Sequence, residues 1–168
     1  MRRGLLWTAV ILTALVLQST VFHEITLMGV SPDLIYLITV LVALLEGPAS
    51  GAVIGFVGGM GEDFLLNAPK GITALTLTLL GYAVGMVRQY IVSPSALVPV
   101  IMVAGGTAAG EMFNGLVKFL LGQLEPGWGY QLKVAILAGL YNAILTPLVF
   151  PIVRRLAESS RAKRVFRW

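Results

Sequence analysis

Apolar residues fall into six long runs along the chain, separated by short polar breaks. The runs cover roughly residues 5–22, 34–46, 48–66, 71–87, 95–121 and 133–153. A helix that crosses a bilayer needs about 20 apolar residues, with a lower limit of about 17. The second run is shorter than this limit. The pattern therefore predicts an all-α, polytopic membrane protein with a compact bundle of six transmembrane helices. The second helix is either a thin upright span or a half-inserted helix.

Composition agrees with the membrane class. The chain has 168 residues, of which 57% are hydrophobic and 12% charged, whereas soluble domains carry about 25% charged residues. No cysteine is present, which excludes disulfides, iron–sulfur clusters and thiol chemistry. The basic start and the apolar run 5–17 are similar to a secretory signal, but this run lacks a clear small-residue cleavage site and further apolar runs follow. We therefore expect a retained first helix.

Residues in the breaks indicate where helices begin. Ser31 is a candidate N-cap, Pro32 suits the first helical position, and Asp33 favours the positive end of a helix. Ser93 and Pro94 repeat this pattern before the fifth run. Residues 67–71 and 125–129 read as turns.

The charges on the breaks orient the predicted bundle. With six crossings and a cytoplasmic N-terminus, most lysines and arginines lie inside and most carboxylates outside, which satisfies the positive-inside rule. We expect both termini in the cytoplasm and a multi-pass protein of the cytoplasmic (inner) membrane. Trp7 and Tyr90 would mark the inner interface, and Trp128 and Tyr130 the outer one.

The end of the chain is basic. We divide the sequence into a six-helix transmembrane domain, residues 1–153, and a basic cytoplasmic tail, residues 154–168. The tail residues expected at the lipid surface are Arg154, Arg155, Arg161, Lys163, Arg164, Arg167 and Trp168. Near an anionic leaflet each basic side chain contributes about 1 kcal/mol. A contact with a cytoplasmic protein is the alternative, and nucleic acid is not expected.

The third run contains a regular stripe of glycines. Gly47, Gly51, Gly55 and Gly59 recur every four residues, and Gly81 and Gly85 repeat the spacing in the fourth run. Residues four apart lie on nearly one helix face, and small residues let membrane helices approach closely. The stripes are candidates for helix packing within the chain or for binding a partner's helix. We hypothesise that the third-run stripe seats a partner's spanning helix.

Several polar residues interrupt the apolar runs. Glu62 and Asp63 end the glycine segment, and ionisable groups in a membrane usually face protein or water. Three roles are open for this acidic pair: a structural role, a partner contact, and proton or ion transfer. In the structural role, Asp63 pairs with Lys70 or accepts hydrogen bonds from backbone N–H groups at the turn.

Further polar residues lie in the last two runs. Glu111, Asn114 and Lys118 share one face of the fifth run and predict an internal polar seam, and Asn142 requires an interhelical partner. Pro147 and Pro151 should bend the sixth helix. His23 is the only histidine, so a zinc site is not expected. We find no catalytic arrangement and expect no enzyme and no cofactor.

Two stretches resemble a known family. The run from Ser31 to Asp63, with P-K-G-I-T-A-L and L-G-Y-A-V-G after it, and the ending Y-N-A-I-L-T-P-L-V-F-P-I-V-R-R resemble MreD, the rod shape-determining membrane protein of bacteria. The family's Gly and Asp pattern is matched at Gly47, Gly51, Gly55, Asp63, Gly71 and Gly81. Its late Asn and Pro are matched at Asn142, Pro147 and Pro151.

The resemblance implies a role in the machinery that elongates the bacterial cell wall. It implies a non-enzymatic scaffold that binds MreC, a single-span protein, and connects indirectly to RodA, a penicillin-binding transpeptidase and MreB. A homodimer remains open. The family is also similar in architecture to the substrate-binding components of energy-coupling factor transporters. The alternative function is therefore a small-molecule (vitamin-like) binding component of a transporter.

Overall fold

The chain was analysed as a computed structural model that describes residues 2–20, 29–65, 71–91, 95, 97–123 and 126–162. Within these ranges the regular structure is helical and no β-strand forms, so the predicted all-α class is confirmed. The elements are α1 (Arg2–Thr20), α2 (Leu34–Glu46), α3 (Pro48–Leu65), α4 (Ile72–Val87), the short 3₁₀ helix η1 (Arg88–Tyr90), α5 (Leu97–Leu120) and α6 (Trp128–Ala162).

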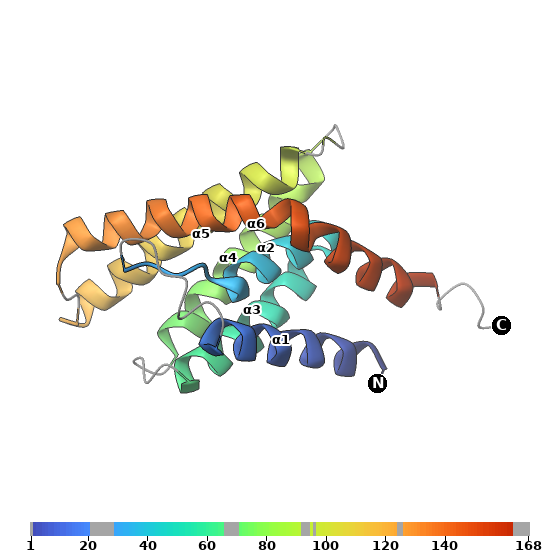
Figure 1. Ribbon diagram of the computed structural model, residues 1–168, viewed down its shortest axis with the longest axis horizontal. Helices are drawn as coiled ribbons and strands as arrows, with labels where there is room; N and C mark the ends of the chain where they lie inside the picture. Colours follow the sequence, from blue (N-terminus) through green and yellow to red (C-terminus); the bar gives the residue numbers. More distant parts are fainter. Residues whose placement is uncertain are drawn as a thin grey trace.

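Helix α2 lies at the centre of the bundle (Figure 1). Every residue from Leu34 to Ala43 is buried, as expected for a helix that is apolar on all sides. It packs against α1, α3, α4, α5 and α6. Its 13 residues span only about 20 Å. The chain enters α2 through a non-helical stretch, residues 29–33, so the second apolar run forms a short helix preceded by irregular backbone.

Glycines join α3 to α4 at backbone contact. A Cβ atom added to Gly51 would lie 2.6 Å from the carbonyl oxygen of Gly81, and one added to Gly59 would lie 2.6 Å from the Cα of Ala74. Gly85 meets Pro48 in the same way. Because α4 fills this face of α3, the hypothesis that a partner's helix lies on it does not hold for the folded chain.

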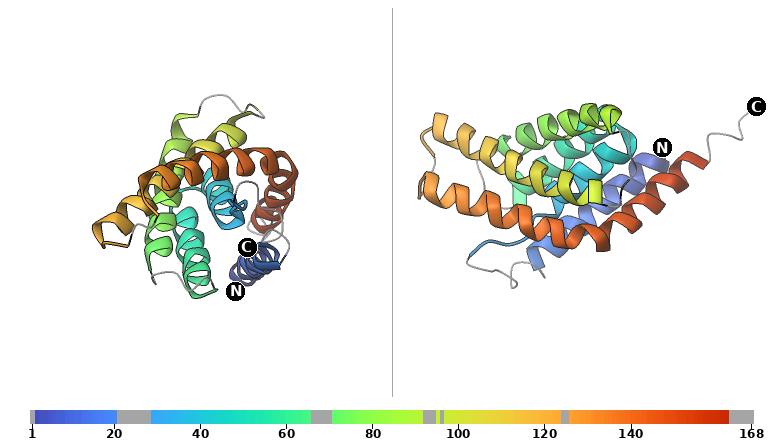
Figure 2. Two further views of the ribbon diagram at one scale, coloured as in Figure 1. Left: turned by 60° about the vertical axis from the view of Figure 1, so that its left-hand side comes forward. Right: turned by 90° about the horizontal axis from the view of Figure 1, so that it is seen from above.

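Helices α5 and α6 form a second pair that covers α2 (Figure 2). Helix α6 contains Pro147 and Pro151 and changes direction in its last third (Figure 1). It continues past residue 153 to Ala162, so no helix end marks the predicted boundary of the tail. There Arg154 forms an exposed ion pair of 2.8 Å with Glu158.

Two helices, Leu97–Leu120 and Trp128–Ser159, are long and apolar enough to cross a membrane by length and composition. Their outer faces carry exposed apolar side chains, with Ile101 66%, Ile144 74% and Leu148 71% exposed. Such faces are costly in water. The start of α1 and the end of α6 lie at the same end of the bundle (Figures 1 and 2).

Two local predictions are wrong. Asp33, and not Ser31, is the N-cap of α2, because its side chain accepts hydrogen bonds from the backbone N–H groups of Ile35 and Tyr36. Trp7 is only 7% exposed and belongs to the core, so it is no interface anchor. Several residues named in the sequence analysis lie outside the described part of the chain: His23, Lys70, Ser93, Pro94, Lys163, Arg164, Arg167 and Trp168. The side chain of Arg161 also lies outside it.

Candidate functional site

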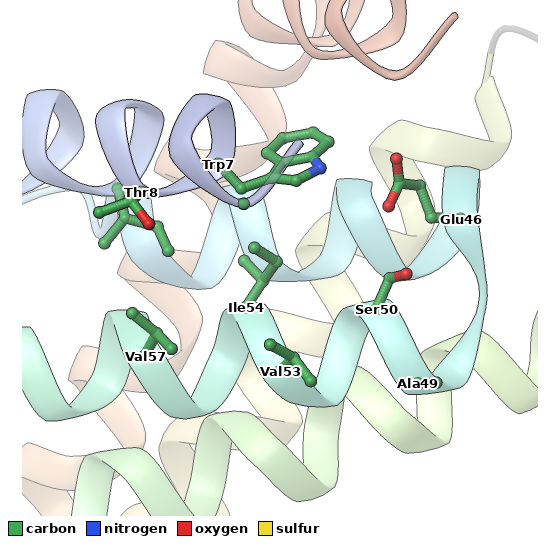
Figure 3. Close-up of a pocket in the computed structure, with 10 residues that line it drawn as sticks. Trp7, Thr8, Glu46, Ala49, Ser50, Val53, Ile54 and Val57 are labelled. Carbon is green, nitrogen blue, oxygen red and sulfur yellow. The ribbon is translucent and has the colours of Figure 1, made fainter. Parts of the chain in front are cut away.

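A groove of about 390 Å³ opens between α1 and α3. Trp7 and Thr8 of α1 form one side, and Val53 and Val57 of α3 form the other (Figure 3). Its lining includes the small residues Gly4, Ala49 and Ser50. These residues allow close approach of another helix. The groove is therefore an apolar, laterally open surface at the end of the bundle where α1 begins.

Two polar side chains lie at one end of this groove, and a third lies nearer the other end (Figure 3). Glu46, the last residue of α2, and Ser50 flank the same end, and Thr8 lies on the opposite wall (Figure 3). Interhelical hydrogen bonds from such side chains contribute about 0.6–2 kcal/mol in membranes. The groove thus combines an apolar floor with a few positions that can fix the register of a bound helix.

A separate polar region surrounds the start of α2. Asp33 Oδ1 accepts the backbone N–H groups of Ile35 and Tyr36 at 3.0 and 3.1 Å. The N–H of Leu34 donates to Oε1 of Gln18, the side chain at the end of α1, at 3.1 Å. Asn142 Nδ2 donates to the carbonyl oxygen of Asp33 at 2.8 Å. Gln18 thus satisfies a backbone N–H group that a helix start leaves unpaired, and Asn142 gives the Asp33 carbonyl oxygen a second donor beside the N–H of Leu37, which lies at 3.2 Å.

Asn142 also ties α6 to α5, since its Nδ2 donates to Thr107 Oγ1 at 3.1 Å. Asn142 is fully buried, and it lies about 21 Å along α6 from Trp128. The start of α2 is therefore level with the middle of α6. The sequence predicted that Asn142 has an interhelical partner. The structure identifies two partners, the backbone before α2 and Thr107, which the sequence position of Asn142 could not specify.

Glu62 and Asp63 are neighbours in sequence and have different surroundings. Asp63 is fully buried, and its carboxylate accepts the backbone N–H groups of Gly71, Thr73 and Ala74 at 2.8, 3.3 and 3.2 Å. Gly71 occupies the N-cap position of α4 and has no side chain that could accept these bonds. Asp63, from the preceding helix, therefore caps α4 in its place. This geometry corresponds to the structural alternative in which Asp63 accepts backbone bonds.

Glu62 faces Gln18 instead. Gln18 Nε2 donates to Glu62 Oε1 at 3.1 Å, while the other carboxylate oxygen, Oε2, is buried and has no hydrogen-bond partner in the described part of the chain. Gln18 thereby joins α1 to both α3 and the start of α2. No pattern in the sequence pointed to Gln18, because a single amide at the end of an apolar run is common.

The α5 residues of the predicted polar seam differ in burial and in hydrogen bonding. Glu111 receives Gln131 Nε2 at its carbonyl oxygen, at 2.6 Å, and at Oε2, at 3.3 Å. Asn114 is 3% exposed, and its Oδ1 has no partner among the described residues. Lys118 lies seven residues beyond Glu111, which is about 10.5 Å along the helix. Only Glu111 of these three lines the cavity described next.

A polar cavity of about 200 Å³ lies between these elements. Its lining includes Gln18, Asp33, Glu62, Glu111 and Tyr130, which come from α1, the stretch before α2, α3, α5 and α6. Three of its lining side chains are carboxylic acids, and none is basic. The described residues hold no group of three His, Cys, Asp or Glu side chains arranged for a metal ion. We name this space the acidic cavity.

Comparison with known proteins identifies the family and adds no solved relative. Searches of curated proteins and of solved structures returned no match. The family described as rod shape-determining protein MreD matches residues 1–157 of the 168-residue chain. This match covers α1 to α5 and α6 as far as residue 157, and it includes the residues of the groove and of the acidic cavity. The chain therefore belongs to the MreD family of rod shape-determining membrane proteins.

Proposed function

We propose that this protein is a non-enzymatic scaffold of the cell-wall elongation machinery and that it binds the single spanning helix of MreC. Family membership supports the role in rod shape. The observation that carries partner binding is the open groove between α1 and α3. The protein would then associate indirectly, through MreC, with RodA, a penicillin-binding transpeptidase and MreB.

The proposed membrane arrangement has six crossings with both termini in the cytoplasm. The start of α1 and the end of α6 share one end of the bundle (Figures 1 and 2), as an even number of crossings requires. The basic residues Arg88, Arg154 and Arg155 agree with a cytoplasmic placement of that end. In this arrangement the groove lies in the inner half of the membrane and the acidic cavity in the outer half.

The groove suits a helix better than the glycine seam does. Backbone contacts with α4 already occupy the α3 glycines, whereas Val53 and Val57, which line the groove, are 61% and 43% exposed. In lipid, association depends on close packing and interhelical hydrogen bonds. The groove offers both, through Ala49, Ser50 and Thr8. In this proposal the partner binds the groove face of α3, whereas the sequence hypothesis placed it on the glycine face.

A matched pair of tryptophan substitutions tests this placement. Val53→Trp fills the groove, and Ile101→Trp places the same side chain on the outer face of α5, where Ile101 is 66% exposed. Overpacking an interface costs about 1–3 kcal/mol, so we expect Val53→Trp to lower MreC recovery by about tenfold at equal expression. Ile101→Trp should leave recovery unchanged. Equal recovery with both variants would place MreC elsewhere.

We do not retain the transporter alternative. Ligand sites for drug-sized molecules usually occupy about 300–1,000 Å³, and the acidic cavity is about 200 Å³. The larger groove has a predominantly apolar lining (Figure 3). Neither space supplies a roomy pocket with several convergent polar groups, which a vitamin-sized ligand needs.

A further inference from the structure

Among the described residues, the lining of the acidic cavity includes three carboxyl groups and no basic side chain. Asp33 faces the positive end of α2 and two backbone donors, which favour its charge. Glu111 receives one amide group. Glu62 also receives one amide, from Gln18, and it is only 6% exposed. An ionised carboxylate at such a position is costly unless a positive or donor-rich group pairs with it.

Unpaired acceptor atoms around the cavity show what is missing. Glu62 Oε2 has no hydrogen-bond partner in the described part of the chain, and the same holds for Asn142 Oδ1. Asn142 is fully buried and bonds the backbone of Asp33, a lining residue. Buried polar atoms in native proteins are rarely left without partners. Of the two atoms, only Glu62 Oε2 belongs to a residue that lines the cavity. An ionised carboxylate accepts hydrogen bonds, so the group missing on the cavity side is a donor.

The backbone beside the cavity agrees with this reading. Residues 29–33 are not helical, and Gly29, Val30 and Ser31 line the cavity with Asp33. Irregular backbone within a membrane bundle is tolerated where protein buries it or where it lines a polar cavity. In carriers, such interrupted segments form the sites that bind charged ligands.

Size and charge then restrict the class of ligand. The cavity of about 200 Å³ has room for a group of a few heavy atoms. Its three acids do not form a metal-binding group among the described residues. A primary ammonium group carries one positive charge and three donors on a small head, which matches one ionised carboxylate and the neighbouring acceptors.

We propose that the acidic cavity binds a small primary ammonium group, with Glu62 as its main counter-ion. The group belongs either to a free small amine or to the ethanolamine head of a phospholipid, because the chemistry recognised is the same. The proposal is independent of MreC binding, since the cavity and the groove share no lining residue.

Two arms of one experiment test the proposal and separate the two sources. The full chain is placed in nanodiscs of phosphatidylglycerol, which has no amine, and titrated with ethanolamine or with its neutral analogue ethylene glycol. In the second arm, native mass spectrometry compares retention of phosphatidylethanolamine with that of phosphatidylcholine and phosphatidylglycerol. We expect saturable binding of ethanolamine but not of ethylene glycol, or selective retention of phosphatidylethanolamine.

Carboxylate substitutions assign the binding to the cavity. Glu62→Gln keeps the size of the side chain and should weaken binding by about tenfold or more, as expected for loss of a charge-assisted hydrogen bond. Glu111→Gln should weaken it less. Glu158→Gln is the control, because this acid is exposed on α6, far along the chain from the cavity. Unfolding temperatures of the variants check that each one folds.

Three results would overturn the proposal. One is equal binding of ethanolamine and ethylene glycol together with no selection among the lipids, as expected if the cavity holds only water. Another is undiminished ammonium binding by Glu62→Gln. The third is that both arms are blank and that only a lysine-bearing segment of a partner protein occupies the cavity. The comparisons made with the unaltered chain remain decisive even if Glu62→Gln fails to fold.

Discussion

Replacement of Gly55 by alanine should force α3 and α4 apart. An alanine Cβ at this position would lie 2.6 Å from the carbonyl carbon of Leu77 and would meet the Leu77 carbonyl oxygen more closely still. The obstacle is helical backbone, which cannot rotate away as a side chain can. A normal contact needs the two helices to separate, although both are fixed against α2. The added methyl group therefore strains the bundle.

Comparison with a second glycine isolates the size of this effect. Gly105, in α5, has no heavy atom within 4 Å of an added Cβ. In a helix interior, alanine is favoured over glycine by about 0.8–1.0 kcal/mol, and this gain applies to both sites. The difference between Gly55→Ala and Gly105→Ala is then the packing cost alone, about 1–3 kcal/mol for overpacking. Gly58→Ala should fall between them, because its obstacle is the Cγ2 of Ile35, at 2.7 Å, a side-chain atom.

Unfolding of the purified chain in mixed detergent micelles, followed by circular dichroism, measures these differences. We expect Gly105→Ala to be neutral or stabilising and Gly55→Ala to be the least stable of the three. Equal stability of Gly55→Ala and Gly105→Ala would refute the backbone contact between α3 and α4.

Substitutions at two further residues examine buried polar groups by the same unfolding measurement. Asp63→Asn keeps an acceptor oxygen for the start of α4 and should destabilise the fold less than Asp63→Leu. The leucine removes a cap worth about 0.5–2 kcal/mol and leaves buried N–H groups unpaired. Equal damage by both variants would mean that the charge itself is required. Asn142→Ala should cost about 1–3 kcal/mol, because it removes a buried amide that donates to both the carbonyl oxygen of Asp33 and Thr107 Oγ1; an unchanged stability would mean that these bonds are replaced.

The positions of the helices followed closely from the sequence. The first five predicted runs agree with their helices to within a few residues at each end. The sixth helix extends beyond its predicted run at both ends. Apolar runs bounded by turn residues are a strong local signal. The central place of α2 was also visible in principle: ten consecutive buried residues reflect a helix without a polar face, and a short helix of that kind belongs in the middle.

The glycine spacing predicted a close helix contact but could not identify the other helix. Spacing of four residues specifies a face on one helix and contains no information about what covers it. Gly81 and Gly85 provide the matching face on α4, and the turn near Gly47 allows α3 to reverse against α2. When both stripes belong to one chain, their packing does not lose the translational and rotational freedom that binding a second molecule would cost. Packing within the chain is therefore favoured over packing against a partner's helix.

The acidic cavity lay beyond prediction for a different reason. It gathers Gln18, Asp33, Glu62 and Glu111 from four segments that share no periodicity, and each of these residues has an ordinary explanation when taken alone. Only the irregular stretch before α2 brings them together, and the Ser-Pro-Asp signal there was interpreted as a helix start two residues too early. A shift of two residues decides whether Asp33 lies within the helix or caps it beside the cavity.

Helix α1 connects the two sites through different kinds of contact. Near its start, Gly4, Trp7 and Thr8 line the groove, and near its end Gln18 bonds both Glu62 and the backbone of Leu34. Helices α3 and α4 are held by backbone contact along their length, which tolerates little movement. The start of α1 is held by side-chain packing, since Trp7 and Ile11 belong to the hydrophobic core. The groove wall that a partner would meet is therefore fixed by side chains, which can change rotamer, whereas the glycine seam is fixed by backbone and is the more rigid part.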